Sequence, residues 1–257
     1  MSLIAFQTAL GRTVRARKET QSSYDGLELS EQEWRNLVRV FSSSGFRATA
    51  NIQRSWCESR AATGAQLTLS ILPLAQRREL IREWVDGGGG TDSFFAFEAA
   101  AFLQFIAQRI PDPSHALSLC RLEQAVLRAE AVAAQFVPPD VALLDQPDCM
   151  VRASPHAAFV AIFAELDQLL LAIEGQGPVP PLSEPHMLLV APGLPGLARP
   201  ADTAEVALWR SLAEPQSIAT LLRQGNELAS IETLWTAGAM ETAFLEGAYD
   251  DLSLALL

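Results

Sequence analysis

The chain has 257 residues, of which 49% are hydrophobic and only 7% aromatic, so its core must rest on Leu, Ala, Val and Ile. Ala and Leu are strong helix formers, and this composition therefore favours a mainly helical protein. The formal net charge is −11, although residues 1–60 carry nine Lys and Arg against six Asp and Glu. The acidic remainder repels nucleic acid and anionic membranes, so neither is an expected partner.

The cysteines indicate a reducing compartment. Cys57, Cys120 and Cys149 are far apart in the sequence and give neither a disulfide framework nor a zinc-binding spacing. The first residues lack the pattern of a signal peptide, and no apolar stretch approaches the roughly 20 residues that span a bilayer. We therefore expect a cytoplasmic protein.

Apolar residues at helical spacing predict a series of helices in the first half of the chain. Leu3, Phe6, Leu10 and Val14 form one stripe. Ser30-Glu31-Gln32-Glu33 is a capping box, in which the Ser and Glu side chains satisfy free backbone N–H groups at a helix start. The apolar face predicted for the helix that follows consists of Trp34, Leu37, Val38 and Phe41.

Further helices are expected at 46–62 and 74–86. The four glycines at 87–90 are not followed by Lys and Ser or Thr, so we interpret them as a flexible helix–helix connection rather than a phosphate-binding loop. The next helix has a stripe of Phe94, Phe97, Ala101 and Phe105, and the last runs from a cap at Ser114 to Phe136. Together these helices predict a compact bundle.

The chain changes character at Pro138-Pro139, where short apolar runs separated by Pro and Gly begin to predict strands. The predicted strands are Met150–Ala153, Ala158–Phe163, Met187–Ala191 and Leu197–Arg199, with a short helix at 165–174. Three helices follow, capped at Asp202 or Thr203, at Ser217 and at Ser230. A strand pair followed by three short helices is the outline of a winged-helix unit.

The predicted fold class is therefore α+β and mainly helical. A helical bundle is expected over residues 1–140, and a winged-helix-like domain with a short β-sheet over residues 141–257.

No residue pattern indicates catalysis or metal binding. His115, His156 and His186 lie on separate segments without a metal-binding motif. Cys120 is five residues from His115, whereas side chains that face each other on a helix are three or four apart. Glu123 borders an apolar stripe, where a carboxylate could be a general acid or a partner contact, and we favour a structural role over both. A stand-alone hydrolase that uses Cys120 or Glu123 remains the less favoured alternative.

The three C-terminal helices also suggest a winged-helix transcriptional regulator. However, residues 230–237 contain no Lys or Arg, and residues 201–257 hold two Arg against nine Asp and Glu. Phosphate contacts supply most of the affinity for nucleic acid. A peptide-binding or structural module is therefore the favoured interpretation.

Two stretches resemble a known family. Pro113–Ala125, PSHALSLCRLEQA, resembles the "leaDlarLEwA" helix of small proteins that accompany iron-dependent TIM-barrel peptide-modifying oxidases. Met187–Pro200 and Thr203–Trp209 resemble the strand, turn, strand and helix of a leader-peptide recognition element, and Ser217–Leu222 stands where that element has its next helix. Over most of residues 90–240 the chain is thus similar to the partner subunit of the 3-thiaglutamate and methanobactin biosynthetic oxidases.

This resemblance implies a non-catalytic subunit without a metal of its own. The iron would sit in the TIM-barrel oxidase, which oxidises a cysteine of the precursor peptide. The helical domain would dock on the oxidase, with Arg121 and Glu123 as docking residues, and the C-terminal domain would hold the precursor. We favour carbon excision of the 3-thiaglutamate type, with the methanobactin type, which forms oxazolone and thioamide, as the alternative.

The leader peptide is expected to add to a strand edge between Met187 and Arg199, beside the third C-terminal helix. Arg199 could meet an acidic leader side chain, and Leu197 would take part in the pairing if its N–H faces the peptide. The predicted peptide-binding residues are Leu188, Val190, Leu197, Arg199, Ile231 and Trp235.

Overall fold

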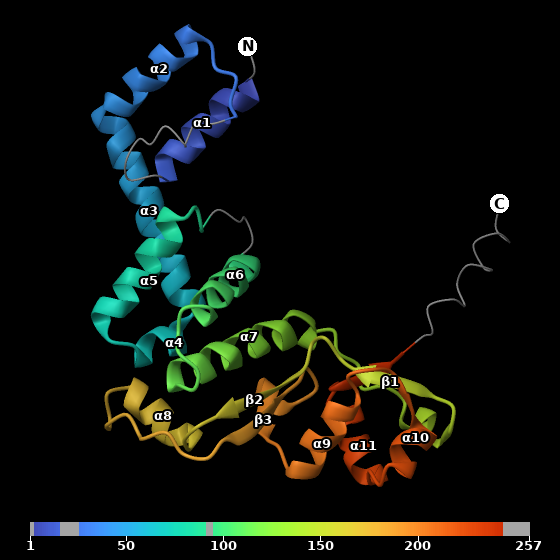
Figure 1. Ribbon diagram of the computed structural model, residues 1–257. Helices are drawn as coiled ribbons and strands as arrows, with labels where there is room; N and C mark the ends of the chain where they lie inside the picture. The colour runs from blue at the N-terminus through green and yellow to red at the C-terminus, as the bar shows by residue number, and fades with distance from the viewer. Residues whose placement is uncertain (1–2, 16–25, 91–94, 244–257) are drawn as a thin grey trace, which may run out of the picture. The chain divides into compact units, whose positions relative to one another are not determined.

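The computed structural model describes residues 3–15, 26–90 and 95–243, and shows an α+β protein that is mainly helical (Figure 1). The predicted fold class is thus confirmed. The contacts divide the chain into two units, residues 1–111 and 112–257. The division therefore lies earlier than the boundary predicted near residue 140, and the helix expected at 114–136 belongs to the second unit.

The first unit is built around its longest helix, α3, against which α1, α2, α5 and α6 all pack. Ser43 ends α2 and also caps α3, because its hydroxyl accepts a hydrogen bond from the N–H of Phe46. The helices of this unit are α1 (Leu3–Arg15), α2 (Glu31–Ser42), α3 (Ser44–Gly64), α4 (Gln66–Ile71), α5 (Leu74–Asp86) and α6 (Phe95–Ala107).

The predicted capping box at the start of α2 is confirmed. The Glu33 carboxylate accepts hydrogen bonds from the hydroxyl of Ser30 at 2.7 Å and from its backbone N–H at 2.8 Å. These hydrogen bonds hold the pKa of Glu33 below its ordinary value. The predicted apolar face is only partly buried, since Leu37 is fully buried whereas Trp34 and Val38 are 38% and 40% exposed.

The face that α6 buries differs from the predicted stripe. Phe97 is 65% exposed, and Phe94 lies outside the described residues. The buried apolar residues of α6 are Ala99, Phe102, Leu103 and Ile106. This helix is apolar on nearly every side, so the spacing of its aromatic residues could not identify the face that packs.

The glycine run that follows α5 packs closely rather than acting as an open linker. A Cβ atom on Gly89 would lie 2.1 Å from the indole of Trp84, and one on Gly90 would lie 2.6 Å from the Cβ of Cys57. Both distances are too short for a side chain. The glycines here allow the backbone to lie directly on these residues.

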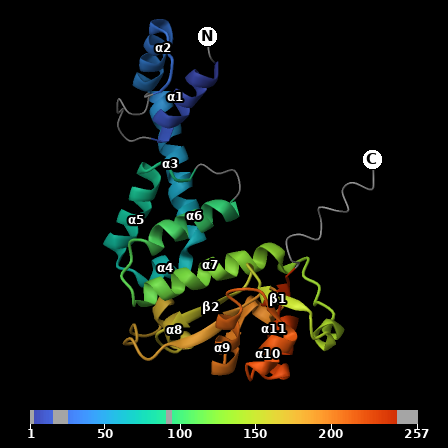
Figure 2. The same cartoon turned by 45° about the vertical axis from the view of Figure 1, so that its right-hand side comes forward.

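The second unit begins with the long helix α7 and contains two antiparallel three-stranded sheets, ordered β2-β3-β4 and β5-β1-β6. Figures 1 and 2 show α7 on one side of the β2-β3-β4 sheet and α9 on the other. Its elements are α7 (His115–Ala133), η2 (Val141–Asp145), β1 (Met150–Ala153), β2 (Ala158–Ile162), α8 (Leu166–Ile173), β3 (His186–Val190), η3 (Pro195–Leu197), β4 (Ala198–Pro200), α9 (Thr203–Ser211), β5 (Gln216–Ser217), α10 (Ile218–Arg223), α11 (Leu228–Thr236) and β6 (Met240–Thr242).

The winged-helix outline is retained, with a different sheet from the one predicted. The helices α9, α10 and α11 share their core with β1, whose neighbours β5 and β6 come later in the chain. The strand pair predicted before the helices forms the separate β2-β3-β4 sheet, with Leu189 of β3 in the same core. The third helix begins at Leu228, two residues before the predicted cap at Ser230.

The segment after α7 is fixed to the C-terminal core, which explains why it does not belong to the first unit. The ring of Phe136 lies so close to Gly193 and Gly238 that a Cβ atom on either would be within 2.5 Å of it. The indole N–H of Trp235 donates a hydrogen bond to the carbonyl of Asp140 at 3.2 Å. Trp235 itself is fully buried and is the largest side chain of the core.

Replacing Gly238 with Ala should lower the free energy of unfolding by more than the same change at Gly225. Both glycines have positive φ, +72° and +88°, so each Ala costs about 1–2 kcal/mol of backbone strain. A Cβ on Gly225 meets open space, whereas one on Gly238 overlaps Phe136 and should cost about 1–3 kcal/mol more. Urea denaturation of both variants measures the difference. Equal losses would show that Phe136 does not pack on this glycine.

Candidate functional site

The second unit contains a groove of about 680 Å³ beside the β2-β3-β4 sheet. Ile162, Leu188 and Val206 line it with apolar side chains that are at most 8% exposed. Its other lining residues come from the start of α8, the segment before β3, strand β4 and helix α9. They include Glu165, Asp167, His186, Ala198, Arg199, Pro200, Asp202, Thr203 and Arg210.

Strand β4 is an edge strand with very little free backbone. Its residue Arg199 pairs with Leu189 of β3, and the flanking hydrogen bonds run from the N–H of Ala191 to the carbonyl of Leu197 and from the N–H of Ala201 to the carbonyl of Met187. In such a register, alternate residues direct their backbone groups away from β3. Ala198 and Pro200 are these residues.

Only Ala198 offers both a donor and an acceptor on the outer edge of β4. Pro200 has no N–H, and its carbonyl oxygen already accepts a hydrogen bond from Nη1 of Arg199 at 2.8 Å. Within the described ranges, neither backbone group of Ala198 has a partner. An added strand can therefore pair with β4 at one residue, which is a shorter edge than the predicted span from Met187 to Arg199.

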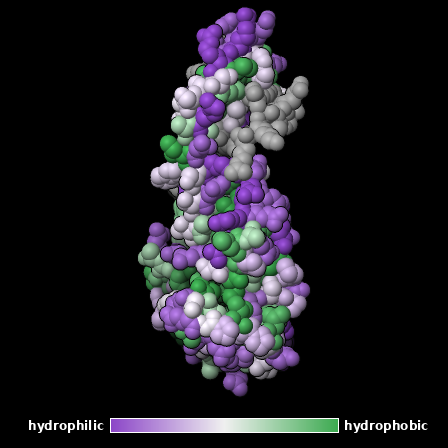
Figure 3. Space-filling view, turned by 90° about the vertical axis from the view of Figure 1, so that its left-hand side faces the viewer, coloured by the Kyte–Doolittle hydropathy of each residue, from purple (hydrophilic) through white to green (hydrophobic). Residues whose placement is uncertain are grey.

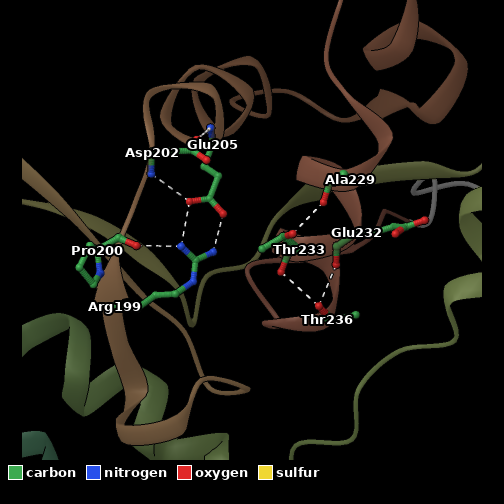
Figure 4. Close-up of polar contacts among 8 residues, drawn as sticks. All are labelled: Arg199, Pro200, Asp202, Glu205, Ala229, Glu232, Thr233 and Thr236. Atoms are coloured by element: carbon green, nitrogen blue, oxygen red, sulfur yellow. Dashed lines mark hydrogen bonds and ion pairs between the residues drawn. The ribbon is translucent and has the colours of Figure 1, made fainter.

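A buried carboxylate joins β4 to α9. Glu205 is 3% exposed and accepts hydrogen bonds from both terminal nitrogens of Arg199, with Nη1 at 2.9 Å from Oε2 and Nη2 on Oε1. The same Oε2 accepts from the N–H of Asp202 at 3.1 Å, while Oδ1 of Asp202 accepts from the N–H of Glu205 at 2.7 Å (Figure 4). This is a capping box extended by a bidentate arginine, and it raises the pKa of the Arg199 guanidinium through the hydrogen bonds to Glu205.

Arg199 therefore has a structural partner within the chain, and the predicted contact with an acidic leader side chain would require that pair to break. A charge reversal at this position would leave Glu205 facing a second carboxylate. The variant Arg199→Glu, which would otherwise be a natural test of peptide binding, would instead disturb the fold.

Replacing Arg199 with Met should destabilise the second unit by about 2–4 kcal/mol, because Glu205 would stay buried without its cation. Replacing Arg152 with Met is the matched control. Its pair with Glu241 is exposed, with side chains 54% and 32% accessible, so we expect a loss below about 1 kcal/mol. Urea denaturation gives both values. If Arg199→Met cost no more than Arg152→Met, the Glu205 pair would not support the fold.

The other predicted peptide-binding residues are not brought together on one surface. Leu188 lines the groove, but Val190, Ile231 and Trp235 are fully buried and cannot meet a peptide. The N–H of Leu197 donates to the carbonyl of Leu194 at 3.0 Å, so it does not face a peptide, and the condition for edge pairing at this residue is not met. Apolar residues at helical spacing pack inward here, as the core requires.

The solvent-facing side of α11 presents small residues instead. Ala229, Thr233 and Thr236 are exposed, and the hydroxyls of the two threonines donate to the carbonyls of Ala229 and Glu232 at 2.7 and 2.8 Å (Figure 4). Helix α11 carries no Lys or Arg. It thus lacks the cations by which a recognition helix contacts phosphates.

The predicted docking residues lie on α7. Arg121 is exposed and donates a hydrogen bond to Asp112 at 2.8 Å, and Glu123 is half-buried. Because α7 belongs to the second unit, both residues are carried by the unit with the groove rather than by the N-terminal helices. Their role in docking stays a prediction.

Cys120 is fully buried within α7, so the hypothesis of an accessible nucleophile there is not supported, and its role as a packed thiol is confirmed. His115 opens α7 and shares a hydrogen bond of 2.8 Å with the carbonyl of Pro180. His186 opens β3 as predicted. In the described part of the chain, no three His, Cys, Asp or Glu side chains form a group that could hold a metal ion.

Unpaired charges at the groove come from α8 and α9. Asp167 lies in the first turn of α8 and Arg210 in the last turn of α9; both are exposed, and neither has a partner among the residues that the structure describes. His186 lies 3.5 Å from Glu165. No sequence motif indicated Asp167 or Arg210, because the two are far apart in the sequence and line the same groove only in the folded chain.

No protein-family model matches the chain, and no curated protein matches its sequence. None of the helices in the described ranges is both long and apolar enough to cross a lipid bilayer.

Proposed function

We propose that the chain is a non-catalytic subunit that holds a precursor peptide for an iron-dependent TIM-barrel oxidase in the cytoplasm. The groove beside β4 carries this proposal, because it combines an apolar floor with one open strand position at Ala198. Backbone pairing with a strand edge supplies affinity, and side-chain pockets supply specificity, which is a common way of binding extended peptides.

In this proposal the subunit binds the peptide and the oxidase performs the chemistry. Holding the precursor raises the effective concentration of its cysteine at the iron of the oxidase, so the subunit needs no reactive group of its own. The iron would be held by the oxidase. We favour carbon excision of the 3-thiaglutamate type, and oxazolone and thioamide formation of the methanobactin type remains the alternative.

A winged-helix regulator is the weaker hypothesis. Its recognition helix would be α11, whose exposed residues are Leu228, Ala229, Thr233 and Thr236 and include no cation. Such a face could not make the phosphate contacts on which affinity for nucleic acid depends.

The proposed role of the groove in peptide binding can be tested by placing a large side chain in it. Thr203 is an exposed groove residue at the first position of α9, and Ala204 is its exposed neighbour outside the lining. We expect Thr203→Trp to weaken binding of a precursor peptide about tenfold or more, because the indole would occupy the peptide's place, and Ala204→Trp to leave it unchanged.

The measurement is fluorescence polarisation with a fluorescein-labelled precursor peptide of a 3-thiaglutamate-type oxidase, with circular dichroism to confirm folding. Equal affinities for the two variants would place the peptide elsewhere on the chain. Absence of binding to the wild-type chain at micromolar concentrations would count against the proposed function itself.

We propose that the first unit provides the main docking surface for the oxidase. Ile52 and Trp56 lie one helical turn apart on α3 and are 59% and 65% exposed, and neighbouring exposed apolar side chains can mark a protein-binding surface. In the sequence, residues 1–60 carry a net positive charge, which would favour an acidic partner surface. Figure 3 shows apolar residues reaching the surface between hydrophilic ones on the face that it views.

Replacing Trp56 with Ser should weaken co-elution of the chain with the oxidase in gel filtration at low salt, since large aromatic residues dominate interface energies. Leu74→Ser is the control, because Leu74 is also exposed, at 56%, but lies on α5. We expect the complex of the control to survive. Co-elution that both variants retain would move the docking surface elsewhere, and no complex with the wild-type chain would contradict the docking proposal.

A further inference from the structure

The charges at the groove deepen the proposed function, on which the following inference rests. Six ionisable groups line the groove, and four of them are engaged within the chain. Arg199 is bound by Glu205, Asp202 caps α9, and His186 lies beside Glu165. Arg210 and Asp167 remain, each without a partner among the described residues.

The helix dipoles explain part of their placement. An aspartate in the first turn and an arginine in the last turn each interact favourably with the helix ends, by about 0.3–1 kcal/mol. That interaction does not engage their charged groups in hydrogen bonds. Both head groups remain available to a ligand in the groove.

A bound peptide would strengthen any pair made with these two residues. The groove floor of Ile162, Leu188 and Val206 is apolar, so a chain lying on it excludes water from the rim. Charge-assisted hydrogen bonds gain strength when water is excluded, and Arg can bind a carboxylate with two parallel bonds. Pairing with the backbone of Ala198 would fix the register, so that alternate peptide side chains point into the groove.

We infer that the segment held in the groove is an extended peptide with an acidic side chain that meets Arg210 and a basic group that meets Asp167. The two charges of opposite sign, on two different elements, select both the composition and the direction of the bound segment. A peptide of the reverse direction would place like charges together, which is unfavourable.

The inference can be tested without knowing the precursor. A displayed library of short random peptides is selected against the wild-type chain and against Arg210→Glu and Asp167→Lys. The control chains are Arg128→Glu and Asp148→Lys, because Arg128 and Asp148 are exposed residues of the same unit outside the groove. Circular dichroism confirms that every variant is folded.

We expect the wild-type chain to enrich peptides with one fixed acidic and one fixed basic position. Arg210→Glu should replace the acidic preference by a basic one, Asp167→Lys should invert the other, and the controls should select like the wild type. A selected peptide whose acidic residue is changed to Lys should bind the wild-type chain about tenfold more weakly and recover that loss on Arg210→Glu.

Enriched peptides without fixed charged positions, or the same selection by Arg210→Glu and Arg128→Glu, would overturn this inference and leave the proposed function standing. A library from which the wild-type chain enriches no peptide would overturn both.

Discussion

The carboxylate of Glu205 is the point on which the second unit depends. Burial of a carboxylate costs several kcal/mol unless hydrogen bonds and an opposite charge offset it. Here Arg199 and the N–H of Asp202 supply both, and each lies on a different side of the connection from β4 to α9. The strand and the helix are therefore held at a fixed separation, and the groove lies along their junction.

Arg199 also limits the hydrogen bonds that the outer edge of β4 can form with another chain. By bonding the carbonyl of Pro200, Arg199 removes an acceptor that would otherwise be open to another chain. A long bare edge invites uncontrolled pairing between molecules, and natural edge strands are commonly short or interrupted by proline. A single open position at Ala198 permits one short pairing and leaves recognition to side chains.

Local structure was largely predictable, because it depends on local chemistry. The strand at Met150–Ala153 and the caps at Ser30, Asp202 and Ser217 all agree with the structure. Asp202 with Glu205 has the same spacing as the capping box at Ser30, and that signal could have identified Glu205. The partners of β1 were missed, since β5 and β6 have two and three residues and no alternation can be detected over such lengths.

The site was predictable only in outline. Helical spacing shows that Ile231 and Trp235 share a face, but it cannot distinguish a core from a groove. Arg199 was correctly placed in a short strand, although it is the middle residue of β4 rather than its end. Its partner comes from the next helix, and the sequence does not reveal which charges pair in space. Arg210 and Asp167 converge through a sheet whose order had to be known first.

The middle position of β1 in its sheet has a consequence for synthesis. This strand leaves the ribosome before any residue that pairs with it, and β6 is among the last described residues of the chain. Both edges of β1 are unpaired until β5 is made and one edge until β6 is made, and pairing across so long a separation is intrinsically slow. The nascent chain therefore exposes unpaired backbone groups of β1 for most of the translation of this unit. A partner or chaperone that covers β1 early would protect the chain from aggregation.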